Sequence, residues 1–144
     1  MTIETIQTGQ TEQEILEAFK GLVEASRALD ARRYFDYVDS DRFTGLSADG
    51  QVWHCVKDLE DVIFPGFRAV EKIVDLQFYR IKVTVINPAT AILVNEYTQT
   101  ILLKNQDVIE QSGGGTQVWA KSGAAWKLVS ISASDSSQRN NAVF

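Results

Sequence analysis

Residues 114–132 read GGTQVWAKSGAAWKLVSIS, and this stretch decides the fold of the chain. Apolar and polar residues alternate on both sides of a short turn that contains Gly123, which is the pattern of two antiparallel strands joined as a hairpin. Each strand carries one tryptophan, Trp119 or Trp126, at a spacing suited to clamping a sheet. The stretch therefore predicts a hairpin with two tryptophans near the end of a β-sheet.

Helices are predicted to come first along the chain. Apolar residues there recur at intervals of three and four, and Thr11 with Glu14 has the pattern of a capping box that starts a helix. Asp58 is expected to cap the third helix, which should kink at Pro65. The predicted helices cover residues 11–29, 31–38 and 58–74.

Strands are predicted to follow, because the apolar period changes to two after residue 75. In the first long strand, Tyr79, Ile81, Val83 and Val85 are expected to share one face. The glycines of residues 113–115 suggest a bulge or a sharp bend. The predicted strands cover residues 42–46, 51–56, 75–87, 89–103, 108–121 and 124–133. This order is typical of an α+β domain whose helices gather on one face of an antiparallel sheet.

Length and charge limit the classes of function. A chain of 144 residues is the size of one domain with its own core. We expect a flexible lead over residues 1–10, a single domain over residues 11–134 and a loose tail over residues 135–144. The net charge is −5 and the basic residues are scattered, so we expect neither a nucleic-acid partner nor a membrane partner.

Location is predicted from what the sequence lacks. Cys55 is the single cysteine, so no disulfide can form within the chain. No apolar stretch is long enough to span a membrane, and residues 1–10 lack the basic and apolar regions of a secretory signal. A cytoplasmic protein is therefore expected.

Three stretches, taken in order and spacing, carry a family resemblance. They are residues 43–50 (FTGLSADG), residues 91–97 (AILVNEY) and the tryptophan hairpin. Together they resemble the SnoaL-like, nuclear-transport-factor-like proteins, a superfamily that includes the association domain of the calcium/calmodulin-dependent kinase and ketosteroid isomerases. The resemblance implies a cystatin-like cone, in which a strongly bent antiparallel sheet and three N-terminal helices enclose a pocket. It also implies a homodimer formed through the outer face of the sheet.

The resemblance also directs attention to two strand positions. Two strands of the kinase association domain each send an arginine into the pocket, and the matching residues here are Asn95 and Gln117. If Asn95 faces inward, the strand period places Leu93, Tyr97 and Gln99 on the same face. The candidate pocket residues are Tyr34, Tyr37, Asn95, Tyr97, Gln117 and Trp119. Such a pocket should be less cationic than that of the kinase domain and suited to a small apolar or aromatic molecule.

A catalytic carboxylate is hard to place. The steroid isomerases of the superfamily need a carboxylate base on an early strand, and residues 43–46 contain none. Glu96 is the best spare candidate, since burial in an apolar strand would raise its pKa to a value suited to proton transfer. Glu96 is adjacent to Asn95 in the strand, however, so its side chain should point to the opposite face. This favours a position at a dimer interface or in solvent.

His54 and Cys55 suggest a base and a nucleophile, but their geometry disfavours the pair. Adjacent residues of an extended strand point to opposite faces, so the two side chains should not meet. We favour a structural role for His54 and expect Cys55 to be a small buried apolar residue. A single histidine without companion ligands also gives no reason to expect a metal site.

Two functions remain open from the sequence. The first is a pocket protein that binds a small apolar or aromatic molecule, with isomerase, cyclase or hydrolase chemistry by general acid and base as one form of it. The second is a non-catalytic, homodimeric association or accessory module. Neither function implies a cofactor. A ligand bound in a cavity ringed by Asn95, Tyr97, Gln117 and Trp119 would favour the first, and a cavity filled by its own side chains would favour the second.

Overall fold

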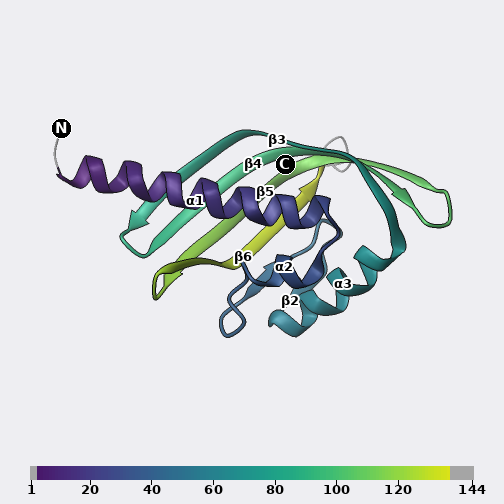
Figure 1. The fold of residues 1–144 in the computed structure, drawn as a ribbon, viewed down its shortest axis with the longest axis horizontal. Helices are drawn as coiled ribbons and strands as arrows, with labels where there is room; N and C mark the ends of the chain where they lie inside the picture. The colour runs from purple at the N-terminus through teal and green to yellow at the C-terminus, as the bar shows by residue number, and fades with distance from the viewer. Residues whose placement is uncertain (1–2, 137–144) are drawn as a thin grey trace, which may run out of the picture.

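The structure is a computed structural model that describes residues 3–136, with side chains described from residue 8. Its elements are α1 (Ile3–Arg27), α2 (Ala31–Phe35), β1 (Thr44–Leu46), β2 (Val52–Trp53), α3 (Val56–Ala69), β3 (Val70–Asn87), β4 (Thr90–Leu103), β5 (Val108–Ser122) and β6 (Ala125–Asp135). The six strands form one bent sheet, and α1 lies across one of its faces (Figure 1). The prediction of a cone-like α+β fold is confirmed. Most of the expected loose tail, residues 137–144, lies outside the described residues.

The sheet is a four-stranded antiparallel meander extended by a small hairpin. Its strand order is β2-β1-β6-β5-β4-β3, with β3 to β6 antiparallel in sequence order. The short strands β1 and β2 pair with each other as predicted, and β1 joins β6 in parallel. The loop between β1 and β2 is thereby brought to the same end of the sheet as α3 (Figure 1).

The predicted start of the first helix was wrong. α1 begins at Ile3, so Thr11 lies inside the helix and residues 3–10 are helical. Glu14, the expected partner of Thr11, accepts a hydrogen bond from Trp126 Nε1 at 2.7 Å instead. The weak helix formers between residues 8 and 11 resemble a helix start, but extending an existing helix costs far less than nucleating one.

The second and third helices are shorter than predicted. α2 ends at Phe35, so Tyr37 follows the helix. α3 begins after Cys55, and Asp58 lies in its first turn, where its carboxylate accepts a hydrogen bond from the backbone N–H of His54 at 2.9 Å. The helix continues through Pro65 as one element and ends at Ala69.

The residues after α3 show why its end was misjudged. Val70, Ile73 and Val74 have helical spacing, yet they lie in β3 opposite the end of β4. The β3–β4 register shifts between Val70 and Lys72 and again between Ile73 and Asp75. Such irregularities break the period of two on which a strand is recognised, so the sequence pattern imitates a helix.

A bulge also divides the face that we expected along β3. The register with β4 shifts between Tyr79 and Lys82, and Arg80 has a left-handed φ of 53°. As a result, Tyr79 points outward and is 41% exposed, whereas Val83 pairs with the fully buried Leu93. The prediction that Tyr79, Ile81, Val83 and Val85 share one face was wrong, because an extra residue reverses the parity of a strand.

Of the bulge or sharp bend predicted at residues 113–115, the bulge is absent from the described strand pairing. These glycines pair in continuous register with both β4 and β6, and the β5–β6 shift lies between Val118 and Trp119. The glycines instead allow the backbones of neighbouring strands to approach each other closely. A Cβ atom on Gly113 would lie 1.8 Å from the carbonyl oxygen of Ser134 on the neighbouring strand, so this position tolerates only glycine.

The core lies between α1 and the sheet. Ile15 and Phe19 of α1 are buried with Leu93 of β4, Trp119 of β5 and Leu128 of β6. The second tryptophan of the hairpin, Trp126, links β6 to α1 through the hydrogen bond that its indole N–H donates to Glu14. Lys121 Nζ lies 3.9 Å from the same carboxylate and 5.8 Å from the Trp126 ring centroid.

Replacing Glu14 with alanine should therefore lower the free energy of unfolding by about 1–2 kcal/mol, because a charge-assisted bond is lost and the indole N–H is left without its partner. Urea denaturation measures the change. Glu17→Ala, at an exposed position of the same helix, is the matched control and should cost much less. Equal stability of the two variants would show that the link from Trp126 to Glu14 does not hold α1 in place.

Candidate ligand-binding cavity

A cavity of about 480 Å³ lies between the helices and the concave face of the sheet. α1 contributes Phe19, Leu22, Val23 and Ser26, and α3 contributes Ile63 and Phe67, so most of the helical wall is apolar. The sheet wall differs, because four amide side chains from β4 and β5 line it: Asn95, Gln99, Gln111 and Gln117. No Asp, Glu, Lys, Arg or His is among the described residues that line the cavity.

The structure brings four of the predicted pocket residues together. Tyr34, Asn95, Tyr97 and Gln117 all line the cavity, from α2, β4 and β5. Gln99, which the strand period placed on the face of Asn95, lines it as well. Gln111 was missed by sequence reasoning, although it lies six positions before Gln117 and so has the same strand parity.

Tyr37 and Trp119 do not line this cavity. Tyr37 lies over α1, where a Cβ atom on Gly21 would be only 2.0 Å from the phenol oxygen. Trp119 is completely buried, and its indole Nε1 donates a hydrogen bond to Gln117 Oε1 at 2.9 Å. Trp119 therefore orients a lining residue from within the core and does not form part of the wall.

The two candidates for catalysis also lie outside the cavity. Glu96 is on the outer face of the sheet, where its carboxylate lies 3.5 Å from Arg80 Nε and its side chain is 41% exposed. His54 is exposed in the turn before α3. Cys55 is exposed at the N-cap of α3, so the expectation of a buried thiol was wrong.

Within residues 3–136, no three His, Cys, Asp or Glu side chains gather closely enough to hold a metal ion.

The amides at one end of the sheet wall form a hydrogen-bonded chain. Gln99 Nε2 donates to Gln111 Oε1 at 2.7 Å, and Gln111 Nε2 lies 3.4 Å from Asp135 Oδ2. A carboxylate only accepts, so Asp135 turns the nitrogen of Gln111 toward itself and the oxygen of Gln111 toward Gln99. The remaining oxygen of Gln99 is therefore the acceptor end of the chain.

Two buried polar atoms on lining residues have no partner in the described part of the chain. They are the indole Nε1 of Trp53 and the side-chain Oδ1 of Asn95. Trp53 is 7% exposed and Asn95 is 8% exposed. An unpaired buried donor or acceptor typically costs about 1–3 kcal/mol, so such atoms are uncommon unless something else satisfies them.

The two tyrosines of the cavity stay protonated well above neutral pH. Burial raises the pKa of Tyr34 to about 12. Burial also raises the pKa of Tyr97, and the negative charge of Asp135 adds to the shift. The Tyr97 hydroxyl donates to the carbonyl oxygen of Ser134 at 3.3 Å. Both side chains are therefore hydrogen-bond donors at neutral pH and poor bases.

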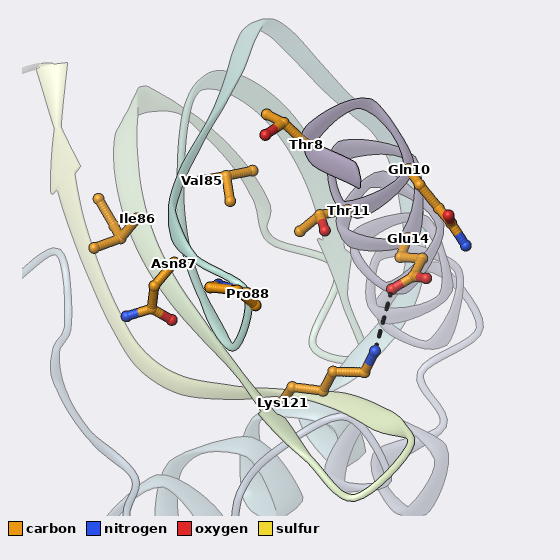
Figure 2. A pocket seen from close by; sticks show the side chains of 9 residues that line it. All are labelled: Thr8, Gln10, Thr11, Glu14, Val85, Ile86, Asn87, Pro88 and Lys121. Carbon is orange, nitrogen blue, oxygen red and sulfur yellow. Dashed lines mark ion pairs between the residues drawn. The ribbon is translucent and has the colours of Figure 1, made fainter. Parts of the chain in front are cut away.

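A second hollow, of about 590 Å³, lies at the other end of α1. It separates the helix from the β3–β4 turn, as Figure 2 shows, and Val85, Ile86 and Pro88 form one side of it. The ion pair between Glu14 and Lys121 crosses its edge (Figure 2). These charged groups already satisfy each other, and neither of the unpaired buried atoms belongs to this hollow. The cavity between helices and sheet is thus the stronger candidate site.

Within the described part of the chain, no helix is both long enough and apolar enough to cross a bilayer.

Solved structures show the same fold in proteins of low sequence identity. A nuclear transport factor 2-like superfamily protein from Salmonella enterica serovar Typhimurium strain LT2 has a TM-score of 0.77 at 18% identity, covering 89% of this chain and 92% of that one. The association domain of Caenorhabditis elegans CaMKII has a TM-score of 0.69 at 15% identity, with coverage of 88% and 97%. A type 2 hexachlorocyclohexane dehydrochlorinase (LinA) has a TM-score of 0.76 at 7% identity, with coverage of 91% and 88%.

The sequence itself gives the family. No curated protein sequence matches the chain. The family model of the SnoaL-like domain matches residues 15–136, which span α1 from its first buried residue to the end of β6. The predicted family is thereby confirmed, and this chain belongs to the SnoaL-like domain family.

Proposed function

We propose that this SnoaL-like protein binds a small, uncharged and largely apolar molecule in the cavity between α1, α3 and the sheet. The observation that carries the proposal is the wall itself, which encloses about 480 Å³ without a charged lining side chain among the described residues. Ligand cavities in proteins commonly measure about 300–1,000 Å³ and combine apolar walls with a few polar groups. An ionic ligand would lose its hydration here and gain no opposite charge.

Binding is favoured over acid–base catalysis by the chemistry of the lining residues. Amide side chains do not titrate near neutral pH, and Tyr34 and Tyr97 hold their protons, so the described wall offers no general base. Glu96 and His54, the side chains that sequence reasoning put forward for that role, are on the exterior. The dehydrochlorinase has the same fold but only 7% sequence identity, so its activity is not evidence for the activity of this chain.

A homodimer through the outer face of the sheet is a second, separate proposal. Val94 and Tyr79 are 39% and 41% exposed on that face, on the neighbouring strands β4 and β3. Burial of these side chains against a second copy would remove apolar surface from water.

Val94→Asp should then shift the protein from dimer to monomer, because two new carboxylates would be buried close together in a two-fold interface. Sedimentation velocity measures the shift. Thr8→Asp, on α1 away from the sheet face, is the control and should leave the dimer intact. A protein that is monomeric before any substitution contradicts the proposal.

An uncharged fluorescent probe tests the cavity directly. N-phenyl-1-naphthylamine should bind with enhanced emission, because its surroundings become apolar. Ala133→Leu should weaken binding at least about tenfold, since Ala133 lines the cavity opposite Gly115 and a larger side chain would occupy ligand space. Ser132→Leu adds the same bulk at the neighbouring position, which alternation turns to the other face, and should bind as the natural protein does. Equal binding by both variants would place the probe outside the cavity.

The raised pKa of Tyr34 predicts a loss of stability in alkali. The unfolded tyrosine ionises near pH 10, whereas the folded one keeps its proton to about pH 12, so folding stability falls across that interval. Tyr34→Phe should remove about 2–3 kcal/mol of this fall, as measured by urea denaturation between pH 9 and pH 12. Tyr37→Phe, which removes a phenol that lies against α1 and outside the cavity, is the control. An unchanged pH profile in Tyr34→Phe would contradict the assignment.

A further inference from the structure

One lining amide has an orientation that its partner fixes. Trp119 Nε1 lies 2.9 Å from the side chain of Gln117, and an indole nitrogen can only donate. The Gln117 atom that faces it must therefore be the oxygen, as the structure has it. Gln117 is 4% exposed and lines the cavity, so its Nε2 is the donor end that remains for other partners.

Asn95 supplies an acceptor close to this donor. Its Oδ1 is buried and accepts no hydrogen bond in the described part of the chain. Asn95 pairs with Gly115 on β5, and Gln117 lies two residues further along β5 on the same face. Diagonal neighbours on adjacent strands are close enough for their side chains to reach a common group.

The space between the two amides is kept open by Gly115. A Cβ atom on Gly115 would lie 3.6 Å from Asn95 Oδ1 and 3.8 Å from Asn95 Nδ2, so a methyl group there would be in van der Waals contact with the amide and would take up space beside it. The glycine also lines the cavity. The site above it is thus bounded by a donor from Gln117 and an unpaired acceptor from Asn95.

From this arrangement we infer that the ligand carries a neutral hydroxyl group on an apolar body. The hydroxyl lies above Gly115, accepts a hydrogen bond from Gln117 Nε2 and donates one to Asn95 Oδ1. A hydroxyl is the smallest neutral group that both donates and accepts. A ketone or an ether would leave the Asn95 oxygen unpaired, and a carboxylate would face that oxygen without a cation in the described wall.

The inference rests on the proposed binding function, and three naphthalene probes separate the two. They are 2-naphthol, which donates and accepts, 2-methoxynaphthalene, which only accepts, and 2-naphthoate, which is charged. Calorimetric titration at pH 7 should give the order naphthol, methoxynaphthalene, naphthoate. Naphthol should bind roughly tenfold more tightly than methoxynaphthalene, because only naphthol satisfies the buried Asn95 oxygen.

The variant Asn95→Leu assigns this preference to one side chain. Leucine has nearly the same size and no acceptor, so the naphthol-to-methoxynaphthalene affinity ratio should fall to about one. Removing an unpaired buried oxygen should leave thermal stability unchanged or raised, which the melting temperature checks. Thr98→Val, at an outward-facing position of the same strand, is the matched control and should keep the tenfold ratio.

The outcomes distinguish the two proposals. If methoxynaphthalene binds as tightly as naphthol, and Ala133→Leu weakens both, the hydroxyl inference is overturned while the binding function stands. A folded Asn95→Leu protein that keeps the preference for naphthol also overturns the inference. If none of the three probes binds, or naphthoate binds most tightly, the proposed function fails and the inference fails with it.

Discussion

The structure depends on the burial of one face of α1 against the centre of the sheet. Ile15 and Phe19 meet Leu93, Trp119 and Leu128, which come from three adjacent strands, so a single helix covers the middle of the bent sheet. That contact removes apolar surface from water on both elements and fixes the distance between them. The cavity lies beside this contact, and its lining residues come from α1, α3 and the sheet.

Hydrogen bonds to neighbouring residues decide which amide atoms face the cavity. Trp119 takes the oxygen of Gln117, and Asp135 takes the nitrogen of Gln111, so donor-only and acceptor-only partners set the direction of each side chain. Gln117 and Gln111 therefore present neutral groups of defined direction. Such a surface discriminates between ligands by hydrogen-bond pattern more than by charge, since an unmatched buried polar group costs more than a matched one gains.

Several boundaries could not be predicted, for reasons of strand register. Val70 and Ile73 imitate a helix because register shifts break the period of two, and Arg80 reverses the parity of β3 in the same way. The exposed position of Glu96, in contrast, agrees with the parity that separates it from Asn95. Parity is reliable along β4, whose pairing with β5 has no shift, and it fails along β3, where long-range pairing inserts irregular residues.

By itself, the sequence determined the family, the order of helices and strands, and the tryptophan hairpin, because hydrophobic period and turn chemistry are local properties. Only the tertiary structure decided that Trp119 lies beneath Gln117, and that Asn95 keeps an unpaired oxygen beside Gly115. The Trp119–Gln117 hydrogen bond depends on the side-chain orientations that core packing imposes within β5. The position of Asn95 beside Gly115 depends on the pairing of β4 with β5, so no local pattern encodes either.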